Sequence, residues 1–153
     1  GGQLARAWET SEEEFAAHLD NNLMAAVCLT QLVLPGMLAQ EQGSLVYIAS
    51  QAGKRAVPGL SAYSASKFAL VGFAQAVAKE IEGSGVKVLI ICPAGMNTAM
   101  REAVFHDAAS QQSPATVANT IVGILCNSPE LPNGAEVIIQ EGKIVHVERS
   151  RTY

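Results

Sequence analysis

Apolar residues dominate a long stretch of the chain from about residue 12 to about residue 40, without the alternation of a half-buried strand. Thr10 and Ser11 precede it, and a glutamate follows three residues after each, which is the capping-box pattern of a helix N-terminus. From Leu23 to Leu34 the stretch is apolar almost all round. We therefore expect one long helix that is buried on every side, with cover from more than one sheet face or from a partner subunit.

Two shorter apolar runs, at residues 44–49 and 86–92, lack alternation and are typical of strands buried on both faces of a parallel sheet. A loop at 50–61 and a helix from about 62 to about 82 separate them. Beyond the second run we expect a short helix near 97–105, a helix over 113–126, a strand at 135–139 and a hairpin partner at 143–147. This order of helices and strands predicts an α/β fold built on a parallel sheet.

The composition suits one globular domain and excludes several function classes. The chain has 153 residues, of which 49% are apolar and 16% are charged, and its net charge is −4. It carries no basic footprint for nucleic acid. No secretory signal is visible, and the apolar run from Leu23 to Leu38 is too short and too interrupted to predict a membrane span.

The sulfur and imidazole side chains predict no metal site, because neither the three cysteines nor the three histidines have metal-ligand spacing. Each cysteine lies in an apolar stretch. We expect buried, reduced thiols in a cytoplasmic protein. The residues concerned are Cys28, Cys92, Cys126, His18, His106 and His146.

Candidate chemistry follows the two predicted parallel strands. Ser50 comes directly after the first strand, and Pro93 to Gly95 follow the second. Ligands in parallel sheets bind beyond the carboxyl ends of strands, so both exits are expected at one crevice. Tyr63 and Lys67, four residues apart near the start of the next helix, share one helix face.

These side chains suit proton transfer to and from an oxygen atom. A free tyrosine has a pKa of about 10, and a cation within about 4–6 Å favours the phenolate. Lys67 is placed to supply that charge to Tyr63, and the Ser50 hydroxyl is placed to hold a carbonyl or alcohol oxygen. Such a site supplies the acid–base half of an alcohol–carbonyl redox reaction, and the hydride requires a cofactor.

The Tyr-x-x-x-Lys pattern, a serine thirteen residues earlier and a strand that ends in Cys-Pro resemble the short-chain dehydrogenase/reductases. The resemblance implies a partial doubly wound, Rossmann-like parallel sheet with flanking helices. It implies NAD or NADP as cofactor, with Tyr63 as acid/base and Lys67 also as a ribose ligand. Asn22 resembles the family's fourth catalytic residue, which binds a proton-relaying water, and Asn21 is the alternative.

The resemblance also assigns the second strand exit to the cofactor. Pro93, Ala94, Gly95 and Thr98 are similar to the turn and threonine that hold the nicotinamide carboxamide, although the family has glycine directly after the proline. Gln51 and Met96, together with Ser50, are candidates for the substrate pocket. Ordinary loop and core positions explain Gln51 and Met96 equally well.

The family's glycine-rich phosphate turn, which should lie far upstream, is not in this sequence, and the first residue is glycine rather than methionine. We therefore expect residues 1–153 to be a single domain, the C-terminal half to two-thirds of such an enzyme. The residues that choose between NAD and NADP are not among them.

The leading hypothesis is an oxidoreductase that interconverts a small-molecule carbonyl and a secondary alcohol. It would form a homo-oligomer through the helices at about 12–40 and 62–82. One alternative is a catalytically inactive fragment that serves as an interaction domain. A second is a lyase or epimerase that uses the same scaffold with a bound cofactor.

Overall fold

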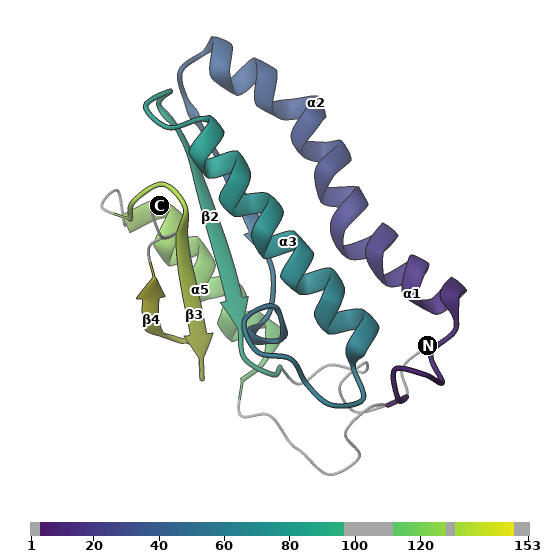
Figure 1. Ribbon diagram of the computed structural model, residues 1–153. Coiled ribbons are helices and arrows are strands. Elements are labelled where there is room, and N and C mark those ends of the chain that lie inside the picture. The colour runs from purple at the N-terminus through teal and green to yellow at the C-terminus, as the bar shows by residue number, and fades with distance from the viewer. Residues whose placement is uncertain (1–3, 97–111, 128–130, 149–153) are drawn as a thin grey trace.

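The computed structural model describes residues 4–96, 112–127 and 131–148 (Figure 1). Its helices are α1 (Glu12–Leu19), α2 (Ala25–Ala39), α3 (Ser61–Glu80) and α5 (Pro114–Asn127). A π-helical turn, η1 (Asp20–Met24), joins α1 to α2, and a 3-10 turn, η2 (Gln51–Gly53), precedes α3. The strands are β1 (Gly43–Ile48), β2 (Val86–Pro93), β3 (Ala135–Gln140) and β4 (Lys143–Glu148). The helix predicted near 97–105 lies outside the described residues.

The four strands form one sheet in the order β1-β2-β3-β4. The first three strands are parallel, and β4 pairs back on β3 in the antiparallel direction. In the pairing of β1 with β2, Gly43 lies opposite Val86 at one end and Ile48 lies opposite Ile91 at the other. This arrangement confirms the predicted α/β fold, including the hairpin after the last parallel strand.

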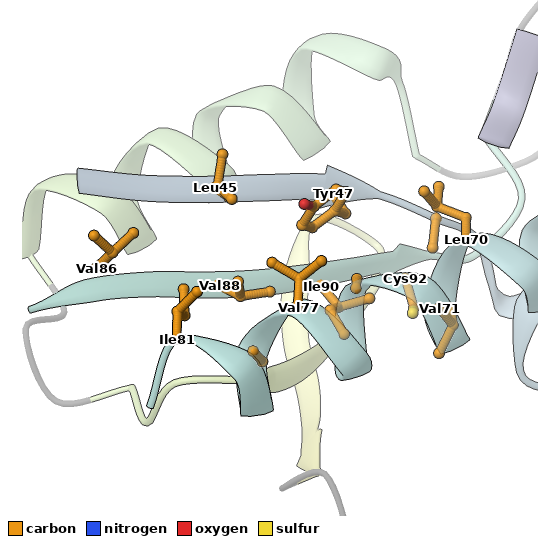
Figure 2. Close-up of a cluster of buried hydrophobic side chains, with 13 residues drawn as sticks. Leu45, Tyr47, Leu70, Val71, Val77, Ile81, Val86, Val88, Ile90 and Cys92 are labelled. Atoms are coloured by element: carbon orange, nitrogen blue, oxygen red, sulfur yellow. The ribbon is translucent and has the colours of Figure 1, made fainter. Parts of the chain in front are cut away.

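The sheet is covered on both faces, which explains why its central strand is apolar at nearly every position. Val88, Ile90 and Cys92 face α3 (Figure 2). The α5-side core on the other face comprises Leu89, Ile91, Val117, Ile124, Ala135, Val137 and Ile139. Figure 2 shows the α3-side cluster. Leu45 and Tyr47 of β1 and the following Ala49 belong to it, as do Ile81 at the end of α3 and five residues of that helix, Leu70, Val71, Ala74, Val77 and Ala78. Because β1, β2 and β3 are parallel and paired in register, their carboxyl ends lie together at one edge of the sheet.

The first predicted helix is interrupted. Ser11 caps α1 by accepting a hydrogen bond from the Glu14 amide at 3.2 Å, as the capping-box pattern predicted. The helical path then continues through η1 into α2, so one uninterrupted α-helix was wrong. A π-helical turn adds a residue to the path and rotates the helix faces before and after it.

The single chain buries only part of this helix, and its predicted cover by a partner subunit stays a prediction. Thr30 is the one buried residue of α2, and Leu29 and Leu32 are 62% and 77% exposed. Within the described chain α2 has neighbours only on the side of α3 and β1 (Figure 1), which leaves its outer face apolar and open. The outer face of α2 is thus an apolar surface that no described residue covers.

The helical stretch Glu12–Ala39 is long and apolar enough to cross a bilayer by length and composition. This is weak support for a span, because core helices of water-soluble proteins meet the same criterion. The expected absence of a membrane span therefore stays a prediction.

The cysteines differ from one another. All three are free, as expected. Cys92 is buried in the α3-side core, but Cys28 and Cys126 are exposed, so their predicted burial was wrong. Their apolar sequence neighbours lie on helix faces that are only partly covered.

Candidate active site

Ser50 lies where β1 leaves the sheet. The Ala49 amide still donates to the Ile91 carbonyl at 2.8 Å, and the chain then turns into η2. Ser50 has an extended backbone, and its Oγ caps η2 by accepting from the Ala52 amide at 3.1 Å. The strand end and the short helical turn together hold the Ser50 side chain at the carboxyl edge of the sheet.

Tyr63 and Lys67 lie in the first two turns of α3, which begins at Ser61. Lys67 Nζ lies 5.8 Å from the centroid of the Tyr63 ring and donates to the Ile48 carbonyl at 3.1 Å. Burial lowers the pKa of the Lys67 ammonium, and the nearby Cys92 sulfur opposes this shift only in part. The hydrogen bond joins the helix that carries Tyr63 to the end of the strand that leads into Ser50.

A glycine allows the Ser50 turn to approach this helix closely. A Cβ atom on Gly53 would lie 2.7 Å from the Lys67 carbonyl oxygen. Only a residue without a side chain lets the backbone of η2 rest directly on α3 here. The distance between Ser50 and Lys67 therefore depends on the absence of one methyl group.

The two asparagines of η1 point in different directions. Asn22 Nδ2 donates to Ser66 Oγ at 3.1 Å, and Ser66 Oγ donates to the Tyr63 carbonyl at 2.8 Å. Asn21 Nδ2 instead donates to its own helix, at the Ala17 carbonyl. Asn22 is thus the asparagine that faces α3. Ser66 is fully buried, as expected of a small residue, but it also links Asn22 to the backbone of Tyr63.

The second strand exit is fixed by a residue that sequence reasoning missed. The Ala94 amide donates to the Ile139 carbonyl at 2.8 Å. The buried Gln112 side chain donates to the carbonyls of Ala94 and Gly95 at 2.8 and 3.3 Å, and its Oε1 accepts from the Gly142 amide. No local pattern marks Gln112, which stands among other small and polar residues. Thr98 lies outside the described residues.

Of the two further pocket candidates, Gln51 is half-buried at the start of η2. Met96 packs against the α5-side core, which supports the alternative interpretation that it is a core residue.

A small hollow next to Tyr63 was not foreseen. It lies between α1 and the start of α3, has a volume of about 20 Å³ and is lined by Glu14, His18, Ser61 and Tyr63 among others. The His18 ring packs edge-on to the Tyr63 ring with centroids 6.0 Å apart. The buried Ser61 Oγ has no hydrogen-bond partner among the described residues. Such a hollow has room for about one water molecule.

The described residues hold no cluster of three metal-ligating side chains. Instead, Ser50 and Lys67 lie at the end of β1. Tyr63 lies beside Lys67 on α3, and Asn22 bonds to Ser66 of the same helix. The candidate side chains comprise a phenol, an ammonium, a hydroxyl and an amide, all of which can bind or exchange protons with an oxygen atom.

Sequence comparisons identify relatives along most of the chain. A model of the short chain dehydrogenase family matches residues 1–109. The ketoacyl reductase HetN from Nostoc sp. is 35% identical over 136 residues, which cover 86% of this chain and 45% of that protein. The oxidoreductase UcpA from Salmonella typhimurium is 36% identical over 103 residues, 67% of this chain and 39% of that protein. The chain thus spans less than half the length of these relatives.

Solved structures agree with the sequence comparisons. A short chain dehydrogenase from Salmonella enterica serovar Typhi superposes with a TM-score of 0.80 at 27% identity, over 90% of this chain and 57% of that one. A short chain dehydrogenase from Escherichia coli, complexed with NADPH, superposes with a TM-score of 0.79 at 28% identity, over 88% and 57%. Because the family model matches well over half of its residues, this chain belongs to the short-chain dehydrogenase family.

Proposed function

We propose that this chain forms the acid–base half of an NAD(P)-dependent oxidoreductase that interconverts a carbonyl and a secondary alcohol. One observation carries the proposal. The hydrogen bond from Lys67 Nζ to the Ile48 carbonyl joins the helix with Tyr63 to the strand that leads into Ser50. Ser50 follows β1 whereas Tyr63 and Lys67 belong to α3, so this bond links the two elements that carry the candidate groups.

In the direction of reduction, the Ser50 hydroxyl donates a hydrogen bond to the substrate carbonyl and orients it. The Tyr63 hydroxyl gives its proton to that oxygen, and the resulting phenolate is favoured by the nearby Lys67 charge. Asn22 would hold a water that returns a proton toward Lys67. In oxidation each proton transfer runs in reverse.

A nicotinamide cofactor, when bound, supplies or accepts the hydride. The described residues suit its nicotinamide end. Gly95 is exposed at the exit of β2, and Gln112 holds the carbonyls of the Ala94–Gly95 turn. Lys67, whose Nζ lies 5.8 Å from the centroid of the Tyr63 ring, would hold the cofactor's ribose. Pro93, Ala94, Gly95 and, outside the described residues, Thr98 would hold the carboxamide. The Escherichia coli relative with NADPH supports this class of cofactor without choosing between NAD and NADP.

The proposal is tested by cofactor binding and by one substitution. The melting temperature of the chain is measured with and without NADH or NADPH. The same measurement is made on the longer protein if its source reading frame extends upstream of Gly1. Carbonyl-dependent oxidation of the bound cofactor is then measured for the wild type and for Tyr63→Phe. We expect loss of about 10²–10⁴-fold in kcat when the acid–base group is removed. Unchanged turnover in Tyr63→Phe would refute the mechanism.

The same assay separates the alternatives. A reductase consumes one cofactor per product, whereas a lyase or epimerase leaves the cofactor pool unchanged. An interaction domain gives no thermal shift and no turnover in either form of the protein.

We also propose a homo-oligomer formed through α1–α2 and α3. The exposed Leu29 and Leu32 on α2 and Phe68 on α3 support it, because monomers rarely leave such apolar surface open. Light scattering tests it: Leu32→Glu should convert the oligomer to monomers. A monomeric wild type at all concentrations would contradict this part of the proposal.

A further inference from the structure

A buried carboxylate bridges the two elements that carry the candidate catalytic residues. Glu136, on β3, is only 2% exposed. One of its carboxylate oxygens accepts a hydrogen bond from Lys54, and the other accepts one from Gln75. Lys54 directly follows η2, the turn that Ser50 caps, and Gln75 belongs to α3, the helix of Tyr63 and Lys67.

We propose that Glu136 is a positioning residue, which fixes the Ser50 turn relative to the Tyr63–Lys67 helix. The inference rests on the proposed function, because it assigns Glu136 a role in that same site. Glu136 does not touch the reacting atoms and acts through Ser50.

The sheet geometry explains why this side chain points at α3. Side chains alternate along a strand, and Ala135, Val137 and Ile139 all belong to the α5-side core. Glu136 therefore faces the α3 side, beside the apolar core there. A carboxylate at such a place is strongly disfavoured unless it is paired and hydrogen-bonded. Lys54 and Gln75 satisfy both of its oxygens.

Lys54 also reduces the electrostatic repulsion between two neighbouring carboxylates, those of Glu136 and Glu148. Glu136 pairs directly with Glu148 across β3 and β4, and like charges at such positions repel. Lys54 Nζ bonds to both carboxylates, and the bond to Glu148 is 2.6 Å long. Burial opposes the charged form of Lys54, but the bonds and charges of the two carboxylates outweigh it and raise the pKa of Lys54 above its ordinary value. Lys54 is therefore held firmly at this position.

Of the two elements that Glu136 joins, the short turn η2 depends more on this bond than the helix α3 does. α3 is anchored by eight buried residues along its length, whereas η2 has only three residues, of which Ala52 and Gly53 are buried. On one side η2 rests on α3 through Gly53, and on the other it is tied to β3 through Lys54. We expect loss of the Glu136 charge to displace the turn and Ser50, and to leave the helix in place.

The test compares Glu136→Gln with a control that lowers stability elsewhere. Thr30→Val removes a buried hydrogen bond between α2 and β1 that involves neither Lys54 nor Gln75. Hydrogen exchange of the chain reports on the turn without any turnover. We expect faster exchange at the amides of residues 52–54 in Glu136→Gln and no change there in Thr30→Val. Gln75→Leu, which removes only the bond to α3, should give a smaller effect in the same direction and replaces Glu136→Gln if that variant does not fold.

Kinetics separate positioning from a merely structural role. In the turnover assay Glu136→Gln should lower kcat by about 10- to 100-fold, as expected of a displacement near 1 Å, with little change in KM. Added to Ser50→Ala it should cause no further loss, because Ser50 is the group through which Glu136 acts.

Two results would overturn the inference. One is an equal loss from Glu136→Gln in the wild-type and Ser50→Ala backgrounds. The other is unchanged exchange at residues 52–54. Absence of Tyr63-dependent turnover in the wild type would instead refute the proposed function, and the exchange experiment would still decide whether Glu136 holds the turn.

Discussion

Gly53→Ala is the most direct test of how the Ser50 turn is held. The new Cβ would lie 2.7 Å from the Lys67 carbonyl oxygen, 2.9 Å from its carbonyl carbon and 3.2 Å from Val71 Cγ2. Two of these atoms are backbone atoms of α3, which cannot rotate away. A comfortable carbon–oxygen contact of about 3.3–3.6 Å requires η2 and α3 to separate by roughly 0.6–0.9 Å.

The size of the effect follows from two opposing contributions. Overpacking of this kind costs about 1–3 kcal/mol of folding stability. Alanine also restricts the unfolded chain, which stabilises by about 0.4–1 kcal/mol. The steric cost is the larger, so Gly53→Ala should lower the free energy of unfolding. The displacement of Ser50 should also lower kcat by about 10- to 100-fold.

Urea unfolding followed by circular dichroism measures the stability change, with Gly123→Ala as the control. Gly123 lies within α5, and a Cβ there would meet no atom within 4 Å. The same chemical change should therefore stabilise the protein at Gly123 by about 0.5–1 kcal/mol. Stabilisation at both glycines would show that η2 does not rest on α3 as described.

Three further predictions concern buried polar groups. Gln112→Ala leaves the Gly142 amide without this partner and should lower the free energy of unfolding by about 1–3 kcal/mol, measured by urea unfolding. Thr30→Val breaks the 2.7 Å bond to the buried Tyr47 hydroxyl and should cost about 1–3 kcal/mol, most of which the double variant with Tyr47→Phe should recover. Burial, followed by the Glu136 charge, raises the pKa of Cys92 from 9.0 to about 11. The folded state thus keeps its proton longer than the unfolded state, so stability should fall as the pH rises from about 9 through about 11, and unfolding curves of Cys92→Ala should lack this component.

Much of the fold could be predicted because most helices and strands carry a recognisable pattern in their own stretch of sequence. Unalternating apolar runs marked the parallel strands, and Ser11 with the glutamates after it marked the start of α1. The π-helical turn η1 could not be predicted, because apolar periodicity across residues 20–24 barely distinguishes it from an α-helix. The exposure of α2 also escaped prediction. Apolar composition reports that a surface favours burial, but not which polypeptide buries it.

Some residues of the candidate site could likewise be predicted from the sequence, and others could not. Ser50, Tyr63 and Lys67 could be chosen because their spacing and their place after strands carry the signal. Gln112 and Glu136 could not, because the carbonyls and side chains to which they are hydrogen-bonded above lie 17 or more residues away along the chain. Glu136 looked like an ordinary polar position in a strand. Only the pairing of β3 with β2 and β4 places it under α3, where its charge requires Lys54.

Two of the open apolar surfaces of the described chain lie on opposite sides of the sheet. Leu29 and Leu32 lie on α2, on one side of the sheet, and Val122 and Leu125 lie on α5, on the other (Figure 1). Between them, no described strand pairs with the outer edge of β1, where Ile48 is exposed. A second copy bound to α2 and α3 would cover the first surface and leave the strand edge and the α5 surface open. An interaction domain with one partner accounts for one surface only. An oxidoreductase subunit that forms a homo-oligomer and whose sheet is extended beyond β1 accounts for the α2 surface and for the strand edge, and the exposed residues there support that proposal.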